Sequence, residues 1–131
     1  MTETVSENSE VTVLLVDDNP QNLKVLYETL KDKGYRLLIA NEGEKALDLA
    51  HRHHPEVILL DIMMPGATGL EVLEKIRQMD ERKSTPVVIL TAKGQDADRQ
   101  AAFSLGANDF LTKPFSPKKL LARIHQIIEG D

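Results

Sequence analysis

Short runs of consecutive apolar residues recur along the chain and alternate with more polar stretches. The runs are continuous rather than alternating apolar and polar, which is typical of parallel strands buried on both faces of a sheet. They predict five strands, at VTVLLV (11–16), YRLLIA (35–40), EVILL (56–60), PVVILTA (86–92) and DFLT (109–112).

Helical patterns follow each of these strands, and their ends carry recognisable signals. The expected starts are Asn19 with Pro20, Asn41 with Glu44, the capping box Thr68–Glu71, a point near Asp96, and Ser116 with Pro117. Gly34 and Gly106 are expected to end the first and fourth helices. Right-handed crossovers between parallel strands would place helices on both faces of the sheet. The pattern therefore predicts one doubly wound α/β domain over residues 11–131, preceded by a disordered tail at residues 1–10.

Composition narrows the class of protein. The chain has 131 residues, which suits one domain with a single core, and its net charge of −5 argues against a nucleic-acid or anionic-membrane surface. It contains no cysteine, so disulfides and thiolate chemistry are excluded. The N-terminus lacks the features of a signal peptide, and no apolar run approaches the roughly 20 residues of a membrane span. We expect a cytoplasmic protein.

Residues suited to chemistry lie at the carboxyl ends of the predicted strands. Asp17 and Asp18 follow the first strand, Asp61 the third and Lys113 the fifth, while Thr91 lies near the end of the fourth. Ligand sites of open α/β sheets lie at this edge. If the first and third strands are neighbours, the three carboxylates converge and repel one another unless they hold a cation. Carboxylates without His or Cys select a hard cation, and Mg²⁺ fits best.

Each of these residues also has an ordinary explanation, as a helix cap, a turn residue, a strand residue or a surface lysine. Their convergence on one edge is what favours a shared site. A Mg²⁺ ion, an ammonium and a hydroxyl together suit a phosphoryl group, because they neutralise or hydrogen-bond its oxygens. With no serine–histidine pair at this edge, the expected nucleophile is a carboxylate, and Asp61 is best placed.

Four motifs in this order, Asp17-Asp18, LLDIMMPGATG, LTA and LTKPF, resemble the receiver domain of two-component response regulators over about residues 10–129. The resemblance implies a flavodoxin-like (βα)5 fold with strand order 2-1-3-4-5. It implies that Asp61 accepts a phosphoryl group from a sensor histidine kinase or a histidine phosphotransfer protein. The protein would then be a signalling switch that assists only its own phosphorylation and dephosphorylation, rather than a metabolic enzyme.

The resemblance also implies roles for individual residues. Asp18 and Asp61 would ligate Mg²⁺ directly, Asp17 mostly through water, and the Met63 backbone carbonyl would be a further ligand. Thr91 and Lys113 would bind the phosphoryl oxygens, with a cis bond between Lys113 and Pro114 aiming the lysine into the site. Phe110 would be the switch aromatic that turns inward when Thr91 moves. The output surface would be the fourth helix, fifth strand and fifth helix, which controls an unknown partner or downstream domain.

Other interpretations stay open at this point. A Mg²⁺-dependent phosphohydrolase with an aspartyl-phosphate intermediate is the main alternative, although such haloacid-dehalogenase-like enzymes use an Asp-x-Asp pair rather than the adjacent Asp17-Asp18. Flavin or dinucleotide modules need phosphate loops that VDDNPQN does not resemble, and intact Asp61, Thr91 and Lys113 argue against a degenerate receiver. Asp109 and Arg123 could support a homodimer across the output surface. The histidines at 51, 53 and 54 are expected to lie on a solvated helix end rather than to bind metal.

Overall fold

The computed structural model describes residues 11–62, 68–80, 84–91, 96–113 and 115–129, apart from the side chain of Asp96. Five parallel strands form one sheet in the order β2-β1-β3-β4-β5. Their bounds are β1 Thr12–Val16, β2 Arg36–Ala40, β3 Val57–Leu60, β4 Val87–Thr91 and β5 Asp109–Thr112. The order confirms the predicted flavodoxin-like topology, with its switch point between β1 and β3.

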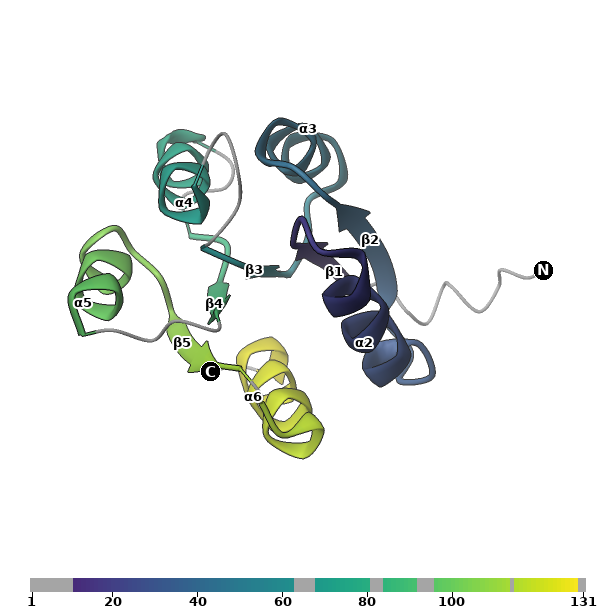
Figure 1. Cartoon of the computed structure of the whole chain (residues 1–131). Coiled ribbons are helices and arrows are strands. Elements are labelled where there is room, and N and C mark those ends of the chain that lie inside the picture. Colours follow the sequence, from purple (N-terminus) through teal and green to yellow (C-terminus); the bar gives the residue numbers. More distant parts are fainter. Residues whose placement is uncertain (1–10, 63–67, 81–83, 92–95, 114, 130–131) are drawn as a thin grey trace.

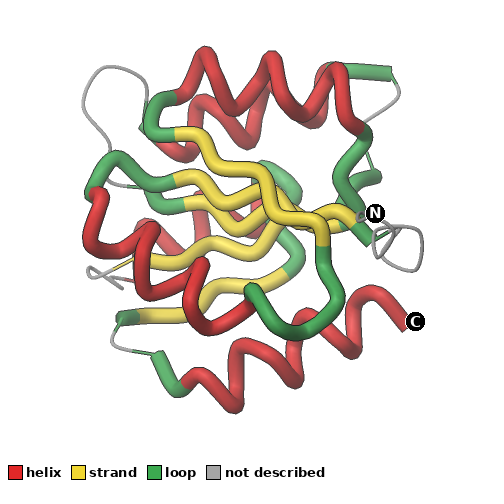
Figure 2. The backbone as a smooth tube through the Cα atoms, turned by 90° about the vertical axis from the view of Figure 1, so that its right-hand side faces the viewer, coloured by secondary structure: helices red, strands yellow, loops and turns green. Residues whose placement is uncertain are grey.

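Helices cover both faces of the sheet, as Figures 1 and 2 show. α2 and α6 pack on one face, and α3, α4 and α5 pack on the other. Their bounds are α2 Pro20–Leu30, α3 Gly43–His53, α4 Gly69–Gln78, α5 Asp96–Ser104 and α6 Pro117–Glu129. The predicted fourth helix, fifth strand and fifth helix are therefore α5, β5 and α6.

The strand residues alternate between two cores, one on each face. In β1, Leu14 and Val16 belong to the core under α3, α4 and α5, whereas Val13 and Leu15 belong to the core under α2 and α6. The central strands β1, β3 and β4 are buried at every residue. This explains why their sequences read as continuous apolar runs, and it makes the strand ends the first places where polar groups can reach solvent.

Most of the predicted helix signals are confirmed. The Asn19 side chain accepts hydrogen bonds from the backbone N–H groups of Gln21 and Asn22 at 2.8 and 3.3 Å. Thr68 and Glu71 form the predicted capping box, and the Ser116 hydroxyl accepts from Lys119 N. The Asn41 prediction was wrong: the N-cap of α3 is Glu42, which makes no side-chain capping bond. The helix starts one residue later than the sequence signal suggests.

At the opposite end of the sheet from the carboxyl ends of the strands, Arg77 of α4 ties three segments together. Its guanidinium donates to the carbonyl oxygens of Gly106 and Thr85, both at 2.7 Å, and to Asn108 Oδ1 at 3.0 Å. Burial lowers the pKa of Arg77. Gly106, with φ of +103°, brings its backbone so close that a Cβ would lie 2.8 Å from Arg77 Nε. The predicted end of the fourth helix at Gly106 thus has a packing reason as well as a conformational one.

Candidate functional site

Backbone hydrogen bonds between neighbouring strands fix the residues at the carboxyl edge. Asp17 N donates to Ala40 O of β2 at 3.2 Å, and Asp61 N donates to Val16 O of β1 at 3.0 Å. On the other side of the sheet, Lys113 N donates to Thr91 O at 2.8 Å. Backbone hydrogen bonds that extend the sheet therefore hold these residues, so the positions of their Cα atoms are well defined.

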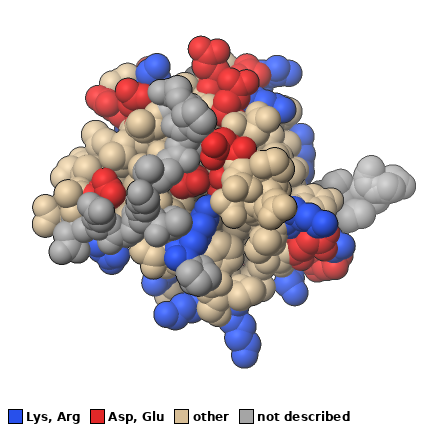
Figure 3. Space-filling model, in the orientation of Figure 1, with Lys and Arg blue, Asp and Glu red and all other residues tan. Residues whose placement is uncertain are grey.

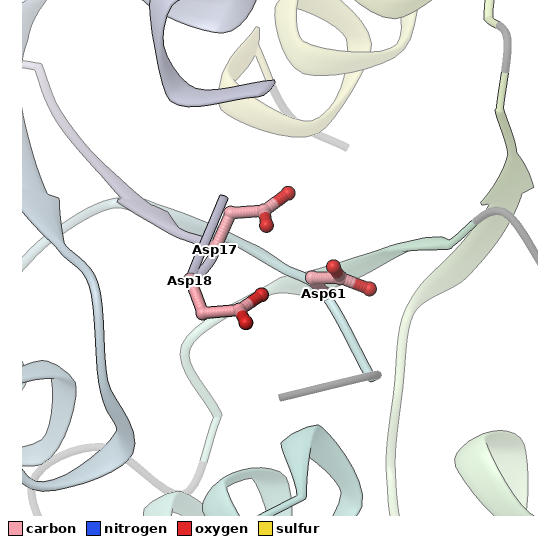
Figure 4. A group of neighbouring side chains, drawn as sticks. All are labelled: Asp17, Asp18 and Asp61. Atoms are coloured by element: carbon pink, nitrogen blue, oxygen red, sulfur yellow. The ribbon is translucent and has the colours of Figure 1, made fainter. Parts of the chain in front are cut away.

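Asp17, Asp18 and Asp61 form the predicted carboxylate cluster. One carboxylate oxygen from each lies within 4.8 Å of one from each of the others. Figure 4 shows Asp17 and Asp18 leaving the end of β1 beside Asp61 at the end of β3. Asp17 and Asp61 are only 1% and 6% exposed, whereas Asp18 is the more accessible member. The prediction that β1 and β3 bring these residues together is confirmed.

Lys113 joins this cluster from the end of β5. Its ammonium nitrogen lies 2.7 Å from Asp17 Oδ2 and 3.6 Å from Asp61 Oδ2, and its side chain is largely buried. The other Asp17 oxygen, Oδ1, accepts from Asn19 N at 3.0 Å. Asp17 is thus paired through both oxygens, which a buried carboxylate requires.

The cluster still carries an excess of negative charge. Three carboxylates and one ammonium leave a formal charge of −2 when all are ionised. Figure 3 shows acidic side chains together near the centre of the view, with basic side chains beside them. The donors are all hard oxygens, and a divalent cation would balance the charge. The residues present therefore fit a Mg²⁺ ion.

Thr91 and Phe110 lie on the neighbouring strands β4 and β5, and Lys113 follows β5. Thr91 ends β4 and is fully buried. Phe110 of β5 is also buried, and it packs in the core under α3, α4 and α5. Phe110 is already turned inward in this structure, so the expected switch would have to exchange this position with a more exposed one.

Gly69 is a residue that the sequence analysis did not connect with the site. It is the first residue of α4, and its N–H donates to Ile62 O at 2.8 Å. A Cβ at this position would lie 2.2 Å from the backbone oxygen of Asp61 and 2.6 Å from the Ile62 Cα. Gly69 is therefore needed for α4 to pack against the backbone of Asp61. The sequence signals were its place right after a predicted helix cap and at the end of the LLDIMMPGATG motif.

Three predicted features lie outside the described residues: the tail at residues 1–10, the Met63 backbone carbonyl as a metal ligand, and the cis bond between Lys113 and Pro114.

The histidines at 51, 53 and 54 lie at the end of α3. His54 lies beyond α3 in the left-handed conformation, so it does not share a helix face with His51. His53 Nδ1 instead lies 3.4 Å from the Arg36 side chain. Among the described residues, the aspartate cluster is the only group of three or more His, Cys, Asp or Glu side chains close enough together to hold a metal ion.

A model of the response regulator receiver domain matches residues 13–125, which is nearly the whole chain. The chain belongs to the receiver domain family of two-component response regulators. That family is a signalling domain, and the phosphohydrolase alternative receives no support.

Relatives and solved structures agree with this family. The transcriptional regulatory protein CpxR of Escherichia coli (strain K12) is 41% identical over 116 residues, which are 88% of this chain and 48% of CpxR. The chemotaxis protein CheY4 of Vibrio cholerae superposes with a TM-score of 0.85 at 33% identity, covering 89% of this chain and 98% of that structure.

A third similar structure is described as holding a metal. The receiver domain of the sensor histidine kinase PA1611 from Pseudomonas aeruginosa is described with a magnesium ion coordinated in its active-site cleft. It has a TM-score of 0.85 and 32% identity, and the alignment covers 92% of this chain and 98% of that one.

This chain spans about half the length of the curated relatives it matches. Within the described residues, no helix has the length and apolarity needed to cross a membrane.

Proposed function

We propose that Asp61 accepts a phosphoryl group from a sensor histidine kinase or a histidine phosphotransfer protein, and that the group changes the surface formed by α5, β5 and α6. The observation that carries this proposal is the position of Lys113, whose ammonium bridges Asp17 and Asp61 at the edge where Asp18 completes the cluster. A switch that controls an output protein or domain follows from the family.

In the proposed reaction, an Asp61 carboxylate oxygen attacks the phosphorus of a phosphohistidine. The new bond joins this oxygen to phosphorus, and the bond between phosphorus and the imidazole nitrogen breaks, so the nitrogen keeps the electron pair. Lys113 stabilises the charge of the phosphoryl oxygens, and the Thr91 hydroxyl donates a hydrogen bond to one of them. The Lys113 ammonium lies closer to Asp17 than to Asp61, at 2.7 against 3.6 Å, so Asp61 is the less tightly paired of the two buried carboxylates with respect to this lysine.

Asp17, Asp18 and Asp61 would hold Mg²⁺, together with the Met63 carbonyl, which lies outside the described residues. When bound, Mg²⁺ neutralises charge on the incoming phosphoryl group. The PA1611 receiver domain supports this assignment, because that similar domain is described with magnesium in its cleft. Phe110 is proposed as the switch aromatic, and a cytoplasmic location stays a prediction from composition.

Phosphotransfer profiling tests the proposal. Purified histidine kinases of the host, autophosphorylated with labelled ATP, are mixed briefly with the chain and with an Asp61→Asn variant. We expect one kinase or phosphotransfer protein to label the parent far faster than the others, and no label on Asp61→Asn. Equal labelling of the two proteins would contradict the role of Asp61.

A further inference from the structure

A groove of about 420 Å³ lies along β5 where α5 and α6 flank it. Phe110 and Leu111 of β5 and Phe115 before α6 supply its apolar lining, and Leu111 and Phe115 are partly buried against the core beneath. Arg99 of α5 and Lys119 of α6 supply its charged lining. The groove therefore combines an apolar floor with a cation contributed by each flanking helix.

Arg99 is held in place by aromatic rings. Its guanidinium carbon lies 5.5 Å from the centre of the Phe110 ring and 5.7 Å from that of Phe103. Phe103 is 41% exposed and lines a second hollow of about 510 Å³ that Arg99 also borders. These distances are within the range of cation–π attraction. Arg99 thus sits between the groove and an exposed aromatic side chain, oriented by the two rings.

Arg99 and Lys119 have no ion-pair partner among the residues whose side chains the structure describes. Asp109, the acid of β5, pairs with Arg123 of α6 instead. No acidic residue is found in the described lining of the groove. The chain as a whole is acidic, with 21 acidic and 16 basic residues, whereas the charged residues in the described lining of this groove are both basic. Figure 3 shows basic side chains along the lower margin of the face, where α6 lies.

We infer that this groove binds an acidic segment of a partner protein, with carboxylates that contact Arg99 and Lys119 and an apolar side chain that lies on Phe110, Leu111 and Phe115. The inference deepens the proposed function, on which it rests for the identity of the output surface. Charge complementarity selects the partner: two cations beside an apolar floor attract carboxylates, and exposed apolar surface favours burial.

A second copy of this chain fits the groove less well. In a twofold contact, residues of the patch meet other residues of the same patch. The described lining of the groove contains no acidic residue that could meet Arg99 or Lys119 of the other copy. Asp109 and Arg123, which the sequence suggested could support a homodimer, pair with each other within one chain. The structure therefore favours an acidic partner over the predicted homodimer through this face.

The test uses a fluorescent peptide probe in which glutamates flank one leucine and one phenylalanine, and a second probe with every glutamate replaced by glutamine. Fluorescence anisotropy measures binding to the parent, to Arg99→Gln, to Lys119→Gln and to the double variant. Lys118→Gln is the matched control, because Lys118 is an exposed neighbour on α6 that does not line the groove. Each groove variant should weaken the acidic probe about threefold, and the double variant about tenfold.

All measurements are made without a phosphodonor and repeated on Asp61→Asn, so the result does not depend on phosphorylation. We expect binding of the acidic probe that Lys118→Gln leaves unchanged, and weak binding of the glutamine probe. Equal binding of both probes, or equal losses in Lys118→Gln and Lys119→Gln, would overturn the groove assignment while leaving Asp61 phosphorylation standing. Sedimentation showing a dimer that the double variant disrupts would assign the groove to a second copy instead.

Discussion

The ammonium of Lys113 lies 2.7 Å from Asp17 Oδ2, although 96 residues separate the two in sequence. The same nitrogen is 3.6 Å from Asp61 Oδ2. One cation therefore serves two buried carboxylates at the ends of β1 and β3. This contact changes what should be expected from substitutions in the cluster. Asp17 is already paired with a cation, whereas the four described charged groups, Asp17, Asp18, Asp61 and Lys113, together keep a net negative charge.

Replacing Lys113 with methionine should strongly destabilise the metal-free protein. The change would leave the carboxylate of Asp17 buried without its counterion, which costs about 3 kcal/mol when a buried pair loses one member. Urea unfolding in EDTA, compared with the parent, measures the loss. Lys31→Met is the matched control, since Lys31 also forms an ion pair, with Glu28, but on the surface. Similar unfolding midpoints for Lys113→Met and the parent would contradict the pairing.

Asp18→Asn should stabilise the metal-free protein. Asp17→Asn would be the obvious choice from sequence, as a way to relieve repulsion, but it would also remove the ion pair with Lys113. Asp18 is the more exposed carboxylate, and relieving its repulsion with the other two should gain about 1 kcal/mol. Thermal unfolding in EDTA should show a melting temperature higher by roughly 3–5 °C. A melting temperature at or below that of the parent would count against repulsion within the cluster.

In Mg²⁺ the parent should be more stable than Asp18→Asn, which is the reverse of their order in EDTA. A ligand that binds only the folded state stabilises it more the tighter it binds, so the parent should gain more from millimolar Mg²⁺ than Asp18→Asn does. Asp48→Asn on α3, an exposed aspartate that pairs only with Arg52 among the described residues, should respond to Mg²⁺ as the parent does. Equal Mg²⁺ effects in the parent and Asp18→Asn would remove Asp18 from the metal site.

Gly69→Ala should impair both folding stability and phosphorylation. The added methyl group would overlap the Asp61 carbonyl oxygen and force α4 away from it, at a cost of about 2 kcal/mol. Gly34→Ala is the control, because Gly34 has a φ of +88° but nothing within 4 Å of the added carbon. It should lose about 1 kcal/mol from backbone strain alone. Only Gly69→Ala should slow phosphorylation by acetyl phosphate, and equal rates in the two variants would refute the positioning role.

A tryptophan at position 110 should report the proposed switch. The chain has no tryptophan, so Phe110→Trp introduces a single tryptophan whose fluorescence can be excited selectively. If the unphosphorylated protein also populates a more exposed position of this side chain, and phosphorylation favours the buried position seen in the structure, acrylamide quenching should fall when acetyl phosphate and Mg²⁺ are added. The response should disappear when Thr91→Val is combined with the reporter. Phe115→Trp serves as the comparison, because Phe115 lines the groove and is only partly buried. Unchanged quenching in Phe110→Trp would argue against movement of this side chain.

The fold was predictable because its determinants are local or periodic. Continuous apolar runs indicated the buried strands, and caps such as Asn19 and Thr68 form the bonds expected of them. The Asn41 prediction was wrong because the sequence alone does not show which of two neighbouring residues caps the helix. The convergence of Asp17, Asp18 and Asp61 followed from the placement of β1 beside β3.

Contacts between distant side chains could not be read in the same way. The sequence placed Lys113 at the correct edge, but its closer approach to Asp17 than to Asp61 depends on the path of one side chain. Gly69 gave no sign that its missing side chain makes room for Asp61. Likewise, Arg99 lies beside Phe110 only because α5 packs against β5, and Asp109 finds Arg123 within the same chain. These relationships depend on how side chains pack in the folded protein, which the sequence pattern does not show.

The central claim is that Asp61 carries the phosphoryl group, and peptide mapping tests it most directly. The parent, Asp61→Asn and Asp48→Asn are incubated with acetyl phosphate and Mg²⁺, the acyl phosphate is trapped by borohydride reduction, and the modified residue is identified by mass spectrometry. We predict modification of Asp61 alone in the parent and in Asp48→Asn, its loss when EDTA replaces Mg²⁺, and none in Asp61→Asn. Modification of Asp17 or Asp18, or an undiminished yield in Asp61→Asn, would contradict the account.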